Sequence, residues 1–205
     1  MTTRVLVVDV ETTGLLSRYD RNHERLDTYP HVLEIAWIVF TQDTWNVVGG
    51  EHAYLNTKQT VTSRITHYTG ITSALLQKKG QDRKSVLERF FADVRKVDVW
   101  VAHNAVFERI VLWAEATRLH IDPSPLDTVP SFCTMHVASS LLRSKHHTMP
   151  PMYSLRNLHR RLFTTKHDDN DDANERRRRH NARDDVLQTL DCYLVLSSSS
   201  SSSYS

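Results

Sequence analysis

The chain alternates short, continuous apolar runs with longer stretches in which apolar residues recur every three or four positions. The short runs are rich in β-branched residues and predict buried strands, at residues 4–10, 33–40, 47–55 and 97–102. The helical spacing predicts helices, at residues 72–79, 83–96, 105–119, 134–143, 154–163 and 181–196. Early strands followed by mixed strands and helices predict an α/β fold, with a mixed sheet flanked by helices.

Some details of this pattern make finer predictions. The pair Gly49-Gly50 indicates a bulge or bend within the third strand. The polar stretches 17–31 and 164–179 are interpreted as loops. In the helix at residues 105–119, apolar spacing predicts one buried face, made of Val106, Phe107, Ile110, Val111 and Ala114.

The length of 205 residues predicts one domain with a sizeable core. We expect residues 1–196 to form this domain. Serines occupy positions 197–203, and such a run cannot bury apolar surface, so residues 197–205 are expected to be a disordered tail. The net charge of +2 does not by itself indicate a polyanionic partner. The local run Arg176–Arg179 either contacts phosphates or is simply solvated.

The cysteine content argues against a disulfide framework, because only Cys133 and Cys192 occur. Cys133 and His136 lack a second Cys/His pair at zinc-site spacing, so a zinc site is not favoured. The chain shows no secretory signal pattern and no apolar run near the ~20 residues that span a membrane. We therefore expect a cytoplasmic protein without membrane association, and leave a nuclear or viral setting open.

Asp9 and Glu11 stand at the end of the first predicted strand, two residues apart. Side chains alternate along a strand, so both carboxylates lie on the face that carries Val5 and Val7. Neighbouring carboxylates raise each other's pKa unless a cation binds between them. The pair fits a metal site, but taken alone it is better explained by a strand that ends with both acids in water. The turn Thr12-Thr13-Gly14-Leu15 that follows either approaches a nucleotide or is an ordinary connection.

Two further acidic clusters lie far along the chain. Asn104 suits a helix N-cap, and Glu108 follows one turn later on the same side of the helix. His180 precedes the last helix, and Asp185 lies in the early turns of that helix. Each of these residues taken alone also fits a solvated surface. Together, four carboxylates and a histidine can hold two divalent cations and deprotonate a water molecule.

In this order the motifs resemble those of the DnaQ-like 3′–5′ exonucleases, of the type with four acidic residues and a histidine, and among these the DNA polymerase III epsilon-like enzymes. The resemblance covers residues 4–196. The matching segments are VVDVETTGLL (7–16), VLEIAWIVF (32–40), RITHYTGIT (64–72), VAHNAVFERIVLWAEATRL (101–119), FCTMHVASSLL (132–142), YSLRNLHRRLF (153–163) and HNARDDVLQTLDCYLVL (180–196).

The resemblance implies a ribonuclease-H-like fold and two Mg²⁺ or Mn²⁺ ions per site. By motif position, Asp9, Glu11 and Asp185 would be direct metal ligands. Glu108 falls at the remaining acidic position and His180 at the general-base position. The substrate would be contacted by Thr12, Leu15 and Asn104.

The implied activity is removal of nucleotides from a single-stranded or frayed 3′ end of DNA, with a DNA polymerase as a partner of such enzymes. An exoribonuclease and a non-catalytic module that binds nucleic-acid ends or a polymerase stay open as alternatives, as does the oligomeric state. One residue departs from the family pattern, since Glu108 stands where aspartate is usual. Its extra methylene moves an extended carboxylate by about 1.5 Å. We expect activity with an altered metal preference or rate.

Overall fold

A computed structural model describes residues 2–16, 26–142, 152–163 and 180–201. Its centre is a five-stranded sheet in the order β3-β2-β1-β4-β5. The strands are β1 (Arg4–Thr12), β2 (Val32–Thr41), β3 (Val47–Tyr54), β4 (Val99–Ala102) and β5 (Ser131–Cys133). β1 pairs antiparallel with β2 and parallel with β4, and β5 is parallel to β4. The predicted mixed sheet is confirmed, and β5 is a short addition that the sequence pattern did not reveal.

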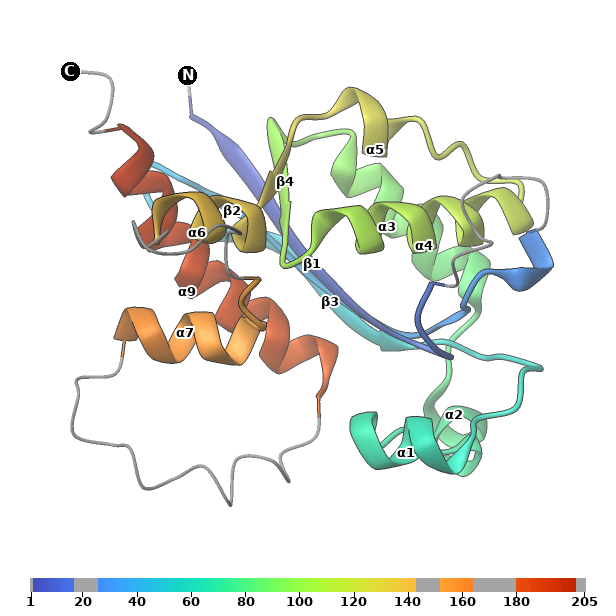
Figure 1. The fold of residues 1–205 in the computed structure, drawn as a ribbon. Helices are drawn as coiled ribbons and strands as arrows, with labels where there is room; N and C mark the ends of the chain where they lie inside the picture. Colours follow the sequence, from blue (N-terminus) through green and yellow to red (C-terminus); the bar gives the residue numbers. More distant parts are fainter. Residues whose placement is uncertain (1, 17–25, 143–151, 164–179, 202–205) are drawn as a thin grey trace.

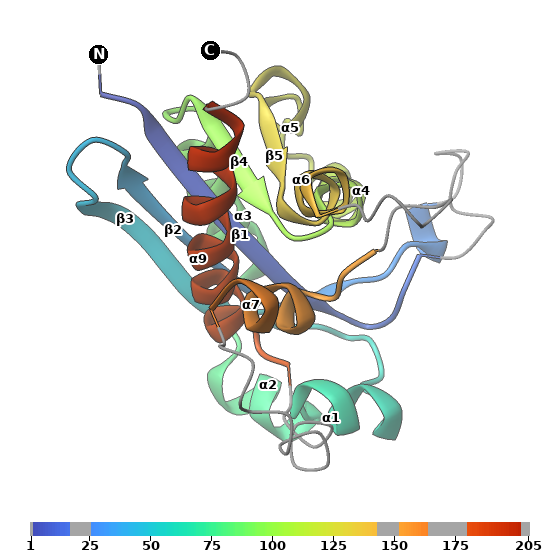
Figure 2. The same cartoon turned by 60° about the vertical axis from the view of Figure 1, so that its left-hand side comes forward.

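Helices cover the two faces of this sheet (Figures 1 and 2). One face carries α3 (Arg83–Val94), α4 (Ala105–Arg118) and the short α5 (Pro125–Thr128), and the other carries α6 (Thr134–Leu141), α7 (Leu155–Phe163) and α9 (Ala182–Ser201). Beyond one end of the sheet lie α1 (Ser63–Thr69), which the pattern missed, and α2 (Ser73–Lys79). A single 3-10 turn, η2 (Leu26–Thr28), precedes β2.

The alternation of side chains along β1 divides the core into two parts. Leu6, Val8 and Val10 pack with the apolar residues of α3 and α4. Val5 and Val7 point the other way and pack with residues of α9, among them Val186. A polar side chain that continues the Val5–Val7 row must therefore emerge beside α9.

The buried face of α4 agrees with the prediction at Val111 and Ala114, which are both buried, and differs from it elsewhere. Val106 is 53% exposed, whereas Glu108 and Glu115 are buried together with Val111 and Leu112. The spacing of Glu108 and Glu115 is seven residues, about two helical turns, so both lie on the inner side of the helix. Hydrophobic spacing missed this face because it counts a glutamate as exposed.

The last helix extends further than expected. α9 continues through Ser197–Ser201, although a disordered tail was expected from residue 197. The Ser197 hydroxyl donates to the carbonyl of Leu194, and Ser198 donates to Val195. These bonds to the preceding turn satisfy the two hydroxyls without interrupting the helix. Residues 202–205 of the expected tail lie outside the described residues.

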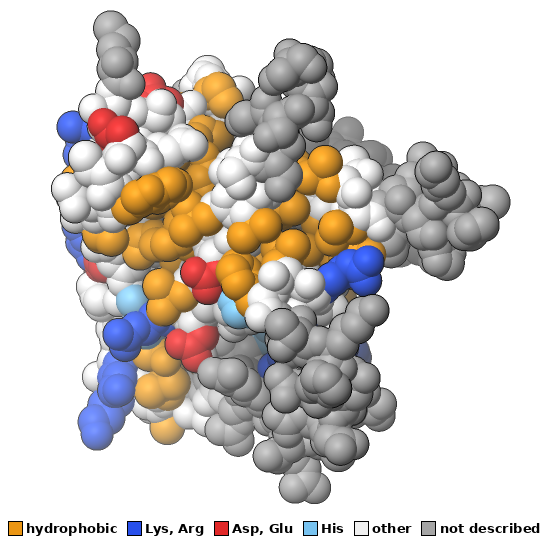
Figure 3. Space-filling view, turned by 90° about the vertical axis from the view of Figure 1, so that its left-hand side faces the viewer, with side chains coloured by type: hydrophobic (Ala, Val, Ile, Leu, Met, Phe, Trp, Pro, Cys, Tyr) orange, Lys and Arg blue, Asp and Glu red, His pale blue; other side chains and the backbone are white. Residues whose placement is uncertain are grey.

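The face that carries α9 shows a band of hydrophobic side chains at the surface (Figure 3). Exposed apolar residues occur on all three helices of this side, including Leu141 on α6, Phe163 on α7 and Leu187 on α9.

Among the described helices, none combines the length and apolar character needed to cross a membrane.

The predicted irregularity at Gly49-Gly50 is present. The β2–β3 register shifts between Val39, which pairs with Gly49, and Phe40, which pairs with Val47. Gly50 has φ 138°, a value that L side chains rarely adopt. A Cβ on Gly50 would lie 2.5 Å from the carbonyl oxygen of Trp37, whereas a Cβ on Gly49 would meet its nearest atom at an ordinary 3.7 Å.

This contrast gives a matched pair of variants. We expect Gly50→Ala to lower the free energy of unfolding by about 2 kcal/mol or more, because backbone strain and overpacking each cost about 1–3 kcal/mol. Gly49→Ala should change it by less than half as much. Urea denaturation followed by circular dichroism measures both, and equal effects would contradict the assignment of strain to Gly50.

Candidate active site

The end of β1 and the start of α9 bring two of the predicted clusters together. Asp9 and Glu11 continue the row of Val5 and Val7, which faces α9. Glu11, His180 and Asp185 each offer a ligand atom, and these atoms lie within 4.8 Å of one another. Residues that are far apart in sequence thus form one group that could hold a metal ion.

The first turn of α9 separates the two neighbouring aspartates. The Asn181 side-chain oxygen accepts from the backbone N–H of Asp184 at 2.9 Å, and its amide donates to the Asp184 carboxylate. Asp184 therefore belongs to the helix cap, while Asp185 faces Glu11 and His180. The backbone N–H of His180 donates to the carbonyl of Tyr68, which ties the histidine to the end of α1.

Glu108 approaches the same region from α4. β4 lies beside β1 and parallel to it, so the residues that follow β4 emerge at the edge where β1 ends. Glu108 is 3% exposed, and its Oε2 atom has no hydrogen-bond partner among the described residues. Asn104 precedes α4 with φ 67°, and its side chain makes no cap hydrogen bond. The predicted cap position is correct, but the predicted role of the carboxamide as a cap is wrong.

The carboxylates raise one another's pKa. Burial, followed by the charges of Glu108, Asp185, Glu11 and Glu34, raises the pKa of Asp9 well above its usual range. Burial and the charges of Glu11 and Asp185 do the same to the pKa of Glu108. For Glu11, burial and then Asp185 raise the pKa from 4.5 to about 8, while His180 opposes the rise. Too little positive charge from the protein lies near these carboxylates to favour their ionised forms.

His180 supplies part of that positive charge. Its Nδ1 atom lies 3.2 Å from Oδ2 of Asp185, and this hydrogen bond raises the pKa of the imidazole. The side chain of His180 is 55% exposed, so the ring faces solvent on its other side. Carboxylate oxygens are hard ligands that Mg²⁺ and Mn²⁺ prefer. The donor set and the unpartnered oxygen of Glu108 both fit divalent cations.

One buried acid near the site was given no role from the sequence. Glu34 on β2 pairs across the sheet with Glu11, is 1% exposed, and raises the pKa of Asp9 and Glu11. Its Oε1 atom lies 2.6 Å from Nε2 of His52 on β3. The available signal was a glutamate inside the apolar run Val32–Phe40, since a lone charge in such a run needs a buried partner.

The histidine beside Asn104 is structural. His103 Nε2 lies 2.9 Å from the Tyr153 carbonyl, which only accepts, so Nε2 carries the proton. Nδ1 then accepts from the Thr134 hydroxyl at 2.9 Å. Burial lowers the pKa of His103, which favours this neutral form. His103 thereby joins the start of α4 to the residues before α7.

The predicted substrate contacts lie where β1 ends. The Thr12 hydroxyl donates to the carbonyl of Gly14 at 2.6 Å, which closes the turn, and Leu15 projects into solvent with 83% exposure. The run Arg176–Arg179 lies outside the described residues. In the described part of the chain, Cys133 and His136 belong to no group of three candidate metal ligands.

Comparison with known proteins identifies the family. The sequence profile of the RNase_T family, described as exonuclease, matches residues 6–193. The chain belongs to this exonuclease family. RNase_T exonucleases use divalent metal ions, in agreement with the carboxylate group. A comparison with curated protein sequences found no match.

Solved structures of Escherichia coli exonuclease I share the fold. The complex with a dT13 oligonucleotide has a TM-score of 0.69 and 17% identity, covering 95% of this chain and 40% of that protein. The zinc-bound complex with single-stranded DNA gives 0.64 and 18%, covering 91% and 39%. The apo form gives 0.64 and 19%, covering 94% and 41%. This chain spans about two fifths of exonuclease I, and the likeness confirms a ribonuclease-H-like fold for the RNase_T domain.

The raised pKa values predict how stability depends on pH without metal. Glu11 ionises near 4.5 when unfolded and near 8 when folded, so its stabilising contribution is complete below 4.5 and lost as pH rises through 8. In EDTA, we expect the free energy of unfolding to be lower at pH 8 than at pH 5. Added Mg²⁺ should restore stability at pH 8, because it binds the folded state.

Urea denaturation at both pH values measures this effect. Glu11→Gln should reduce the difference between pH 5 and pH 8, while Glu88→Gln, at an exposed position, serves as the control. A wild-type protein that is equally stable at both pH values in EDTA would contradict the electrostatic account.

Proposed function

We propose that this exonuclease domain hydrolyses the terminal phosphodiester bond at the 3′ end of single-stranded or frayed DNA, as a DnaQ-like enzyme of the polymerase III epsilon type. The observation that carries the proposal is the convergence of Glu11, His180 and Asp185, with Asp9 and Glu108 interacting electrostatically with the same group. The motif order and the family membership support it. Residues 1–196 are proposed as the catalytic unit.

The carboxylates are proposed to hold two Mg²⁺ or Mn²⁺ ions. Asp9, Glu11 and Asp185 would be direct ligands, and Glu108, with its unpartnered oxygen, would complete the set. Such ions, when bound, lower the pKa of a water molecule and stabilise charge on a leaving oxygen. The four acids would neutralise the charge of the ions and fix their position.

His180 is proposed as the general base. Asp185 holds one ring nitrogen, Nδ1, and in the neutral ring Nε2 would be unprotonated and available to take the proton of the attacking water. Bound cations would supply the positive charge that the imidazolium otherwise gives to the carboxylates, which favours this neutral ring. The backbone bond from His180 to Tyr68 fixes the position of the main chain while the exposed ring stays free to approach substrate. The proton then leaves through solvent, which the exposed side of the ring contacts.

Substrate contacts are proposed for the turn after β1 and for the start of α4. Leu15, almost fully exposed, would pack against the terminal base, and Thr12 shapes the turn that presents it. Asn104 offers a carboxamide that does not cap its helix. Apolar stacking tolerates every base, so little sequence preference is expected.

Digestion of labelled oligonucleotides tests the activity and its direction. With Mg²⁺ or Mn²⁺, a 3′-labelled DNA strand should release labelled mononucleotide at once, and a 5′-labelled strand should shorten stepwise. EDTA should stop both reactions. A ribo-oligomer in the same mixture should be degraded more slowly. No release with either metal would refute the enzyme, and faster loss of RNA would assign an exoribonuclease.

A second experiment tests the role of His180. His180→Ala should lower kcat by about 10²–10⁴-fold, the usual contribution of a general base, and leave Mn²⁺ affinity nearly unchanged. His136→Ala, which removes an exposed histidine on α6, is the matched control. Calorimetry measures Mn²⁺ binding, and unchanged kcat in His180→Ala would remove this residue from the mechanism.

A further inference from the structure

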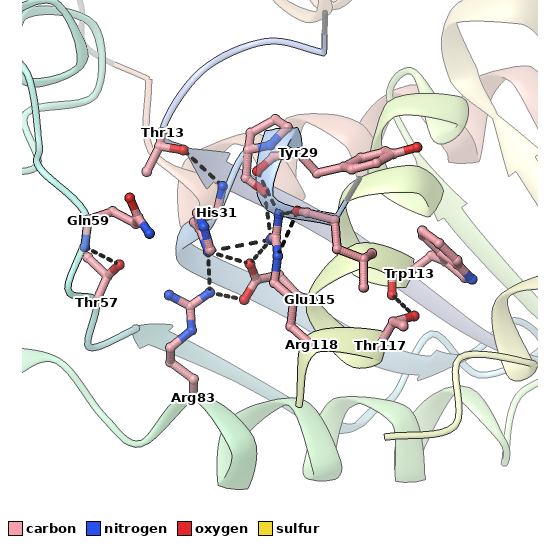
Figure 4. Close-up of polar contacts among 12 residues, drawn as sticks. Thr13, Tyr29, His31, Thr57, Gln59, Arg83, Trp113, Glu115, Thr117 and Arg118 are labelled. Carbon is pink, nitrogen blue, oxygen red and sulfur yellow. Dashed lines mark hydrogen bonds and ion pairs between the residues drawn. The ribbon is translucent and has the colours of Figure 1, made fainter. Parts of the chain in front are cut away.

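A second buried carboxylate on α4 lies at the centre of an ionic cluster (Figure 4). Glu115 is 0% exposed and contacts three side chains from three different segments. Its Oε1 atom lies 2.5 Å from Nη1 of Arg118 and 3.0 Å from Nδ1 of His31, and its Oε2 atom contacts Arg83. The cluster therefore joins α4, α3 and the residues just before β2.

His31 adds no charge to this cluster. Burial, followed by the charges of Arg118 and Arg83, lowers the pKa of His31 to about 4, so the ring is neutral near pH 7. Glu115 offsets one of the two arginine charges, and Asp27 also acts on Arg118, where its charge opposes the lowering of the pKa by burial. Without Glu115 the guanidinium groups of Arg83 and Arg118 would be buried side by side.

Arg118 extends the cluster to the backbone before β2. Its guanidinium donates to the carbonyls of Leu26, Tyr29 and Pro30, at 2.7 Å for Tyr29. These carbonyls come from the 3-10 turn η2 and the residues that lead into β2. The planar guanidinium group presents its N–H donors in a fixed arrangement, so these hydrogen bonds hold the segment before β2 in one conformation.

The backbone of His31 also forms hydrogen bonds to the turn after β1. The backbone N–H of Thr13 donates to the carbonyl of His31 at 2.9 Å. The backbone N–H of His31 donates to the Thr13 hydroxyl, also at 2.9 Å. We call these two bonds the Thr13–His31 clamp. The clamp holds Thr13, which lies between Thr12 and Gly14 and two residues after Glu11.

The same helix therefore contacts both sides of the substrate-binding edge. Glu108 near its start faces the carboxylate group, and Glu115, two turns later, anchors the turn that carries Thr12 and Leu15. We propose that Glu115 is a positioning residue for the active site, acting through Arg118, His31 and the Thr13–His31 clamp. This inference rests on the proposed function, because it assigns the clamped turn a role in binding the 3′ end.

The first measurement does not depend on nuclease activity. Amide hydrogen exchange of Thr13, followed by NMR in the full chain, should be slow in the wild type because its N–H is bonded to His31. In Glu115→Gln, which keeps the shape and removes the charge, we expect this exchange to become about 10-fold faster or more, as local opening becomes easier. Unchanged exchange at Thr13 would overturn the proposal.

Kinetics then test the consequence for substrate. For a single-stranded DNA oligonucleotide with a free 3′ end, we expect Glu115→Gln to raise KM by about 10-fold and to change kcat by less than about 3-fold. Thr13→Val removes the hydroxyl and should raise KM in the same direction, while Thr13→Ser keeps the acceptor and should restore the wild-type value. The double variant Glu115→Gln/Thr13→Val should have no higher KM than the worse single variant.

Two controls separate positioning from general destabilisation. Val94→Ala makes a cavity at the other end of α3 from Arg83 and should lower stability without changing KM. If Glu115→Gln does not fold, an unchanged KM in Thr13→Val still overturns the proposal, because this variant weakens the clamp and leaves the buried ions intact. Multiplicative effects of the two substitutions on KM, or a raised KM in Val94→Ala, would overturn the proposal. A wild type without nuclease activity refutes the proposed function instead, and the exchange of Thr13 still tests the clamp.

Discussion

Mutual repulsion among carboxylates at one edge of the sheet is the constraint on which the rest of this structure depends. Burial, and after it the charges of neighbouring acids that include Asp185, raises the pKa of Asp9, Glu11 and Glu108, so the fold holds these groups where ionisation is unfavourable. The hydrophobic packing of β1 against α9 on one face and α4 on the other supplies the free energy that keeps them there. A cation bound among these carboxylates would favour their ionised forms and relieve the repulsion between them.

One face of α4 carries two buried glutamates, Glu108 and Glu115. Its inner side carries Glu108 toward the site and Glu115 toward two arginines, and the two glutamates experience opposite surroundings. Glu108 lacks nearby positive charge, whereas Glu115 is surrounded by it. The arginine contacts of Glu115 tie α4 to α3, while burial and the charges of Glu11 and Asp185 make ionisation of Glu108 unfavourable.

The sequence predicted the regular elements and the candidate acids, because both leave local signals. The strand period placed Asp9 and Glu11 on the face of Val5, and the motifs singled out Asp185 although Asp184 is adjacent. Partners that come from distant segments left weaker signals. The burial of Glu115 depends on Arg83 and Arg118, and the contact of Glu34 depends on His52. Hydrophobic periodicity cannot detect a charge whose neutralising group lies elsewhere in the chain.

The bulge at Val48, beside Gly49 and Gly50, has a consequence for association between chains. β3 is at the border of the sheet, and in the described part of the chain it pairs with β2 on one side only. Such a border strand offers unpaired N–H and C=O groups, which can template the addition of another chain. A bulge increases local twist and breaks the regular spacing of those groups. The bulge thus makes β3 a poorer template for edge-to-edge association, at the side of the sheet remote from β5.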